Sequence, residues 1–144
     1  MQLRDIYQST IVDNALNQQH QKPLTEPDVL RKTLFNSSCG DRITVSGKIS
    51  QHKLNQISFK ATGCIISRAS ANMMGNLCIK QDLSKIDSLV TDFSKLMTGE
   101  PIKNPKSLGE AQALQSISEL PTRIKCAMLP WKAIYQLINQ NEVK

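Results

Sequence analysis

The sequence predicts an α+β fold, a small antiparallel sheet of about three strands packed by helices. Two observations lead to this prediction. Apolar and polar residues alternate through residues 43–61, as half-buried strands require, and on both sides of that stretch the apolar residues recur with a helical period. Because strands and helices are segregated along the chain, the pattern favours an α+β fold over a parallel α/β sheet.

The first half of the chain carries one helix and the strands. Apolar spacing predicts a helix over residues 3–16, and two prolines mark residues 17–27 as a polar loop. We expect an edge strand over residues 29–35. Alternation at residues 43–49 and again at 57–61, with a turn between them at residues 50–52, predicts an antiparallel hairpin with one solvated face.

The second half of the chain is predicted to be helical. An apolar stripe marks a helix over about residues 65–79, and a second helix is expected over residues 83–97. Glycine and prolines interrupt the pattern at residues 98–105, after which a short helix is expected over residues 107–117. The last predicted helix starts at Pro121, a favoured first-turn residue, and runs towards residue 139.

Length and composition predict one globular domain over residues 1–144. Leu, Ile, Val and Phe make up about a quarter of the 144 residues, which is too apolar for a disordered chain. No apolar run approaches the roughly 20 residues that span a bilayer, and the N-terminus lacks a secretory pattern. We therefore expect a cytoplasmic protein without a membrane partner.

The net charge of +6 does not indicate a nucleic-acid partner. Its 18 basic and 12 acidic residues interleave along the whole chain, and only 4% of the residues are aromatic. Proteins that bind nucleic acid usually gather their cations on one face beside stacking aromatic side chains. A solvated surface, or a patch for an acidic protein partner, fits the pattern better.

Four cysteines carry the clearest chemistry. In a reducing compartment, thiols serve as metal ligands or reactive groups rather than as disulfides. The long spacings match no zinc finger, so buried unreactive thiols are the alternative interpretation. Cys39, Cys64 and Cys126 each lie where an element begins or ends, whereas Cys78 falls among apolar helix positions and is predicted to be core.

Three cysteines and one carboxylate could share an ion. Residues two apart in an extended strand face the same way, so Cys39 and Asp41 could reach one ligand-binding point. Cys64 is expected at a helix N-terminus and Cys126 in the first turns of the last helix, next to basic residues; both settings favour thiolate. If the four side chains meet, zinc accepts such a tetrahedral set.

Such a site would carry a net charge of about −2 with a divalent ion, because it combines three thiolates and one carboxylate. Arg42, Arg123 and Lys125 are the cations that we expect to support it. Two alternatives remain open from the residues alone: Arg42 as a solvated strand residue, and Asp41 as a turn residue that caps its own backbone.

Pro130 lies four residues after Cys126 in the last predicted helix. A proline there cannot donate a hydrogen bond to the Cys126 carbonyl. We therefore expect a kink or break over residues 127–130, which would leave that carbonyl free beside the site. The alternative is that Pro130 starts a second helix.

Three segments carry a resemblance to a known family. Residues 39–43 (CGDRI), 63–74 (GCIISRASANMM) and 123–127 (RIKCA) resemble, in this order, the signatures of the SufU branch of the IscU/NifU N-terminal family of iron–sulfur cluster assembly proteins. The long stretch between the second and third cysteines fits this branch, as does Lys125, where the IscU branch has a histidine.

The resemblance implies a SufE/IscU-like fold and a function in sulfur transfer. Cys39, Asp41, Cys64 and Cys126 would bind zinc, and Cys39 would accept persulfide sulfur from a PLP-dependent cysteine desulfurase of the SufS type. The protein would then activate that enzyme rather than act alone, and other cluster-assembly proteins could be further partners. Ser37, where the family often has Asn-Pro before the first signature, is a departure that removes no ligand.

A scaffold function is the main alternative. The same four ligands could hold a [2Fe–2S] cluster that is assembled on the protein and passed to apoproteins, because three cysteines and a carboxylate suit either metal. A third interpretation, a structural zinc protein that binds nucleic acid, predicts a salt-dependent interaction that we do not expect.

Overall fold

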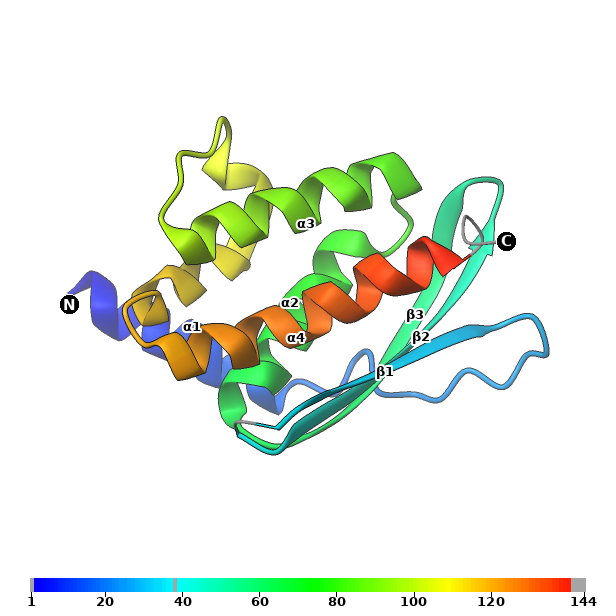
Figure 1. The fold of residues 1–144 in the computed structure, drawn as a ribbon, viewed down its shortest axis with the longest axis horizontal. Coiled ribbons are helices and arrows are strands. Elements are labelled where there is room, and N and C mark those ends of the chain that lie inside the picture. Colours follow the sequence, from blue (N-terminus) through cyan, green and yellow to red (C-terminus); the bar gives the residue numbers. More distant parts are fainter. Residues whose placement is uncertain (1, 38, 141–144) are drawn as a thin grey trace.

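The computed structural model describes residues 2–37 and 39–140 and confirms the α+β prediction (Figure 1). Helix and strand positions agree with the periodicity of the sequence to within a few residues. In chain order the elements are α1 (Leu3–Leu16), β1 (Leu30–Asn36), β2 (Asp41–Ser50), β3 (Lys53–Thr62), α2 (Ile65–Cys78), α3 (Leu83–Thr98), the 3₁₀ segment η1 (Pro105–Ile117) and α4 (Pro121–Ile138).

The three strands form one antiparallel sheet in the order β1-β2-β3. The hairpin between β2 and β3 turns at Gln51 and His52, which have φ values of 53° and 65°. Two consecutive positive φ angles are what a two-residue type I′ turn needs, and such turns match the twist of the flanking strands. At the opposite end of β2, Asp41 pairs with Asn36 and Arg42 pairs with Thr62. The turn between β1 and β2 therefore lies close to the end of β3.

One face of the sheet packs against helices. Along β2, the side chains of Ile43 and Val45 are buried, whereas Arg42 and Thr44 point to the other face. Helix α4 lies along β1 and β2, α2 lies along β3, and α3 packs on α4 away from the sheet (Figure 1). The alternation in the sequence therefore encodes the difference between the two faces.

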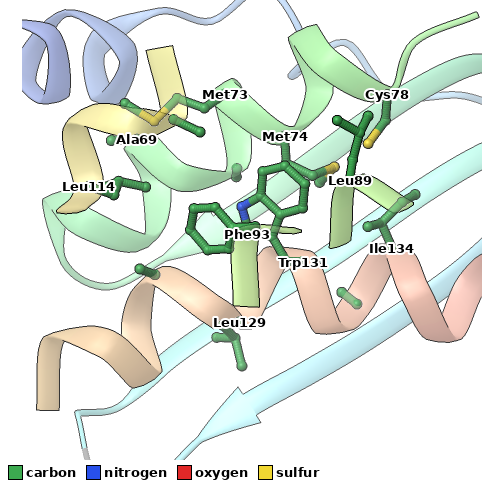
Figure 2. Packing of buried hydrophobic residues seen from close by; sticks show 14 of the residues in the cluster. Ala69, Met73, Met74, Cys78, Leu89, Phe93, Leu114, Leu129, Trp131 and Ile134 are labelled. Carbon is green, nitrogen blue, oxygen red and sulfur yellow. The ribbon is translucent and has the colours of Figure 1, made fainter. Parts of the chain in front are cut away.

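The centre of the helical layer is an aromatic pair. Phe93 of α3 and Trp131 of α4 stack with their ring centroids 4.4 Å apart, surrounded by aliphatic and methionine side chains (Figure 2). The indole N–H of Trp131 donates a hydrogen bond to Ser70 Oγ at 3.1 Å, and Ser70 Oγ donates to the Ala127 carbonyl at 2.6 Å. This buried hydroxyl joins α2 to α4 and leaves no polar group of the indole unsatisfied.

A break at Pro130 is wrong, and so is the alternative that a second helix starts there; the kink and the free Cys126 carbonyl stay predictions. Helix α4 continues from Pro121 to Ile138 with Pro130 inside it. Pro130 removes one helical hydrogen bond, but the surrounding turn is fixed from outside by Ser70, which bonds the Ala127 carbonyl, and by the buried Trp131. Tertiary packing thus offsets a local interruption that the sequence alone overstates.

The short helix expected over residues 107–117 is a 3₁₀ segment instead. It spans Pro105–Ile117 and is divided at Gly109, whose φ of 51° and ψ of −133° are not helical. Apolar residues still face the core, Leu108 and Leu114 being fully buried. The segment therefore buries its apolar side without a regular α-helix.

Among the described residues, no helix is both long and apolar enough to cross a bilayer.

Replacing Ser70 with Ala should lower the free energy of unfolding by about 1–3 kcal/mol, because it leaves the buried Trp131 N–H without a partner. Urea denaturation measures this change. Ser88, whose hydroxyl makes a comparable bond to the Ser84 carbonyl on the exposed side of α3, is the matched control, and Ser88→Ala should change stability by less than about 0.5 kcal/mol. Equal effects would contradict a structural role for Ser70.

Because the Cys78 thiol is buried, we expect the folded protein to be less stable at alkaline pH. Its side chain is fully buried in the core, and burial raises the pKa of the thiol from 9.0 to about 12. Above pH 9 the unfolded chain releases this proton while the folded chain keeps it, so the free energy of unfolding should fall by about 1.4 kcal/mol per pH unit. Urea titrations between pH 8 and 10.5 should show a steeper fall for the wild type than for Cys78→Ala; parallel curves would contradict this assignment.

Candidate metal centre

Asp41 is the first residue of β2, and its side chain is fully buried. Its Oδ1 accepts a hydrogen bond of 2.8 Å from the backbone N–H of Cys64, the residue that caps α2. A carboxylate next to a helix N-terminus is stabilised by the helix dipole. The bond joins the start of one element to the start of another, 23 residues apart along the chain.

Gly63 makes this approach possible. Its φ of +129° lies in a region that favours glycine, and a Cβ there would stand 1.9 Å from Asp41 Oδ1. No side chain fits in that space unless the carboxylate moves. Gly63 therefore sets both the direction of the chain between β3 and α2 and the position of Asp41.

Cys39 lies in the tight turn between β1 and β2. Gly40 has a φ of 75°, and its N–H donates to the Asn36 carbonyl at 2.8 Å. The turn places Cys39 Sγ 3.1 Å from Cys126 Sγ of α4, although the two residues are 87 apart in the chain. Both are free thiols, since this separation is far longer than the roughly 2.05 Å of a disulfide.

Cys39, Asp41 and Cys126 form a compact donor group. One ligand atom from each lies within 4.8 Å of the other two. In a tetrahedral site with zinc-like bond lengths, ligand atoms stand roughly 3.3–3.8 Å apart, so a small adjustment would close these three around one ion. Cys64 is not in this group, but its Sγ lies 3.1 Å from Asp41 Oδ2.

The protonation of the group reflects its burial. Burial would raise the pKa of the Asp41 carboxyl, but hydrogen bonds from Cys126, from the Cys64 N–H and from the other thiols together lower it. The pKa of the Cys126 thiol is raised strongly, first by burial and then by its contacts with Cys39 and Asp41. The group thus combines an Asp41 carboxylate stabilised by hydrogen bonds with a Cys126 thiol that holds its proton strongly.

The three cations expected to support the site lie on its outside. Arg123 and Lys125 are exposed in the first turns of α4, beside the buried Cys126. Arg42 follows Asp41 on β2, so its exposed side chain points to the opposite face of the sheet. None of these three lies between the donor atoms themselves.

Two residues at the site were missed from the sequence. In the sequence Gly63 is only one residue of a motif, because its close approach to Asp41 depends on three-dimensional proximity. Ser67 is buried, and its Oγ donates to the Cys64 carbonyl at 3.1 Å. For Gly63, a glycine between the end of a strand and the start of a helix is a usable signal in the sequence. Ser67 gives no such signal, because its hydrogen bond is of a local kind that is common in the first turn of helices.

Comparison with known proteins places these residues in a family context. Residues 6–127 match the family described as NifU-like N terminal domain. The chain belongs to this family. The match includes the turn with Cys39, the strand with Asp41, the α2 cap with Cys64 and the start of α4 with Cys126. All four residues expected from the sequence to bind metal thus lie within the matched region.

Two relatives within the NifU-like family carry different functional names. The chain is 34% identical over 140 residues to the zinc-dependent sulfurtransferase SufU of Bacillus subtilis strain 168, covering 97% of this chain and 94% of the relative. It is 31% identical over 139 residues to the iron-sulfur cluster assembly scaffold protein IscU of Streptococcus pyogenes serotype M1, covering 96% and 86%.

A solved structure has the same fold. The putative iron-sulfur cluster assembly scaffold protein for the SUF system from Fervidobacterium islandicum AW-1 superposes with a TM-score of 0.86 at 25% sequence identity. The superposition covers 95% of this chain and 99% of that one. The similarity therefore extends over the whole NifU-like fold, including the sheet and the helices around the donor group.

Replacing Gly63 with Ala should impair metal retention, because the new methyl group displaces the Asp41 carboxylate. The matched control is Gly99→Ala: Gly99 also has a positive φ, of 77°, but a Cβ there meets nothing within 4 Å and lies outside the site. Metal per chain after dialysis against a chelator of moderate affinity is the measurement. Equal metal content in both variants would show that Asp41 does not depend on this clearance.

Proposed function

We propose that this protein is a zinc-binding sulfur acceptor in iron–sulfur cluster assembly, which takes persulfide sulfur from a PLP-dependent cysteine desulfurase. The observation that carries the proposal is the compact group of Cys39, Asp41 and Cys126, in which one thiol is accessible. The name of the Bacillus subtilis relative, a zinc-dependent sulfurtransferase, supports the same function. This function belongs in the cytoplasm, where thiols stay reduced.

The donor chemistry fits zinc. Structural and catalytic zinc sites combine cysteine sulfur with carboxylate oxygen in a tetrahedron. The three clustered residues supply two sulfurs and one oxygen, and Cys64, whose Sγ contacts the Asp41 carboxylate, is the fourth ligand in this proposal. When bound, zinc keeps its cysteine ligands as thiolates at neutral pH.

Cys39 is the acceptor because it is the accessible thiol of the compact group. Cys126 and Asp41 are fully buried, whereas Cys39 is half-buried in the turn before β2. The neighbouring Gly40 faces open space, since a Cβ there would meet nothing within 4 Å. A partner's cysteine can therefore approach Cys39 from the solvent side without displacing the core.

The transfer step is a thiol–disulfide type of exchange. The Cys39 thiolate attacks the terminal sulfur of the persulfide on the partner's cysteine and forms a new S–S bond. The partner's own S–S bond breaks, and its electron pair leaves with the partner's cysteine thiolate, which solvent can protonate. No net oxidation occurs, because one persulfide replaces another.

Asp41 and the basic residues have positioning roles in this step. The bond from the Cys64 N–H keeps the Asp41 carboxylate in place while Cys39 moves towards the partner. Arg123 and Lys125, exposed beside Cys126, supply positive charge near the anionic persulfide. Their effect should be moderate because solvent screens exposed charges.

Cys39→Ser should abolish stimulation of the cognate desulfurase while the protein stays folded, because serine cannot carry the sulfane sulfur. The measurement is sulfide or alanine release from cysteine, with persulfide on the acceptor trapped by alkylation and mass spectrometry. Cys78→Ser makes the same atomic change at a fully buried core position and should retain stimulation.

A Cys39→Ser protein that stimulates the desulfurase as well as the wild type would refute the acceptor assignment. Loss of stimulation in both serine variants would instead point to a general structural effect. Cys78 is a suitable control because it is not among the described residues whose ligand atoms lie together in the donor group.

Assembly of a [2Fe–2S] cluster on the same ligands is the second candidate function. It is favoured by the names of the Streptococcus pyogenes relative and of the Fervidobacterium islandicum structure, both called scaffold proteins. Metal analysis of protein purified without oxygen separates the two: about one zinc per chain without visible absorbance supports sulfur transfer, whereas iron with inorganic sulfide supports the scaffold.

A further inference from the structure

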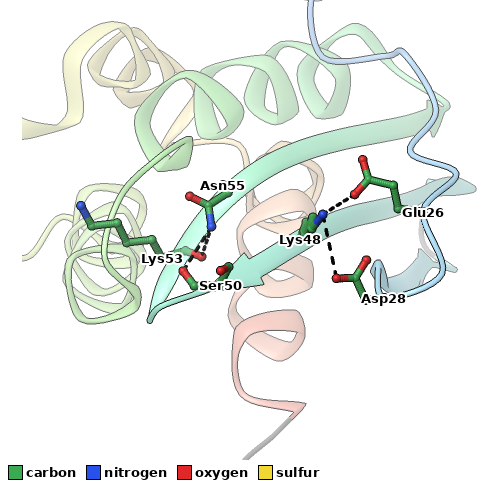
Figure 3. A network of polar contacts seen from close by, with 6 residues as sticks. All are labelled: Glu26, Asp28, Lys48, Ser50, Lys53 and Asn55. Carbon is green, nitrogen blue, oxygen red and sulfur yellow. Dashed lines mark hydrogen bonds and ion pairs between the residues drawn. The ribbon is translucent and has the colours of Figure 1, made fainter.

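The outer face of the sheet has two halves that differ in what covers them. Away from the donor group, the segment between α1 and β1 crosses the face, and the Leu24 carbonyl accepts a hydrogen bond of 2.6 Å from the Arg31 guanidinium. On the same half, Lys48 of β2 forms ion pairs with Glu26 and Asp28 of this segment (Figure 3). On this half of the face, two acidic residues of the covering segment thus neutralise Lys48.

The other half of the face is more exposed, and the covering segment reaches only its border, where Thr44 and Lys60 line a hollow together with Leu24. A second hollow of about 250 Å³ on this half is lined by Arg42 and Thr44 of β2 and by Lys60 and Thr62 of β3. Phe35 of β1 pairs with Arg42 in the register, and the residue is 63% exposed. We name these five residues the near-face patch.

The near-face patch carries positive charge that the protein itself does not neutralise. Within residues 2–37 and 39–140, Lys48 is the only basic side chain that forms an ion pair. In the register, Arg42 pairs with Thr62 and Thr44 pairs with Lys60, so the two cations lie diagonally across neighbouring strands. Like charges at such positions repel, and an acidic ligand between them would relieve that repulsion.

The near-face patch also adjoins the donor group. Arg42 directly follows Asp41 on β2, and Thr62 is separated from Cys64 only by Gly63. Successive strand residues face opposite sides, so the patch and the donor group occupy the two faces of one end of the sheet. A partner that reaches Cys39 around this end would lie over the patch.

We propose that the near-face patch is the docking surface for an acidic segment of the desulfurase, which would lie on it as Glu26 and Asp28 lie on Lys48. This inference rests on the proposed function. Phe35 would supply an apolar anchor at the edge of a polar, charged contact, an arrangement typical of protein interfaces. Phe35 is the one aromatic residue of the patch, which favours a protein segment over a nucleic-acid strand, because such a strand stacks successive bases on several rings.

The test is desulfurase binding and stimulation by the double variant Arg42→Glu/Lys60→Glu. We expect its apparent Kd for the desulfurase to rise about ten-fold or more at low salt, with the difference from wild type shrinking as salt is added. The matched control is Lys85→Glu/Lys103→Glu, two exposed lysines on α3 and after it. Both double variants change the net charge of +6 equally, so the control isolates the local effect.

The single variant Phe35→Ala should weaken desulfurase binding by a similar factor at low and at high salt, because it removes apolar contact rather than charge. Unfolding midpoints close to that of the wild type check that each variant is folded.

If the wild type fails to stimulate the desulfurase, the proposed function fails. If the wild type stimulates and Arg42→Glu/Lys60→Glu binds equally well, the docking inference is overturned while the proposed function stands.

A labelled single-stranded oligonucleotide is the last probe. Binding of the oligonucleotide that depends on Arg42 and Lys60, together with unchanged desulfurase binding, would assign the patch to nucleic acid and overturn the inference. Absence of oligonucleotide binding, together with weakened desulfurase binding in the double variant, would support it.

Discussion

The buried Asp41 carboxylate is the constraint on which the site depends. A carboxylate that is removed from water is costly unless hydrogen bonds replace its hydration, and here the replacement is the N–H of Cys64 together with neighbouring thiols. To make these contacts, β2 must begin where α2 begins, and Gly63 must leave the space empty. The same requirement brings Cys39 and Cys64 to one end of the sheet, where Cys126 of α4 meets them.

The rest of the fold holds this end of the sheet in register. The β2–β3 pairing places Arg42 opposite Thr62 and thereby fixes the distance between Asp41 and the cap of α2. Helix α4 is joined to α2 through Ser70 and Trp131, so the helix that carries Cys126 is anchored in the core one turn beyond the site. Rigid elements therefore surround the buried Asp41 and Cys126, while the turn with Cys39 and the start of α2 with Cys64 face solvent.

Much of the architecture could be predicted from the sequence because its period changes clearly. Alternation in the strands and helical spacing elsewhere gave the correct order of elements. The break predicted at Pro130 is wrong because the packing of Ser70 and Trp131, which no local pattern reveals, outweighs the local effect of the proline. The regular helix expected over residues 107–117 is also wrong, because Gly109 adopts a non-helical conformation although the apolar spacing around it is helical.

The candidate site was predictable in its residues more than in its geometry. Short motifs around Cys39, Cys64 and Cys126 identified donors far apart in sequence, but not which of them are accessible or that Cys64 would meet the others through Asp41. The strand alternation that directs Asp41 inward also directs Arg42 outward, so a cation expected beside the ligands instead marks the opposite face. Such assignments need the pairing of strands, which a single sequence does not specify.

The most direct test of the central claim is X-ray absorption at the zinc edge of the protein as purified. The account predicts a four-ligand shell with mostly sulfur at about 2.3 Å and one oxygen at about 2.0–2.2 Å, and replacement of Asp41 by Ala should remove that oxygen contribution. A shell of nitrogen and oxygen alone would contradict a centre built from Cys39, Asp41, Cys64 and Cys126, as would zinc binding that is unchanged when the cysteines are replaced.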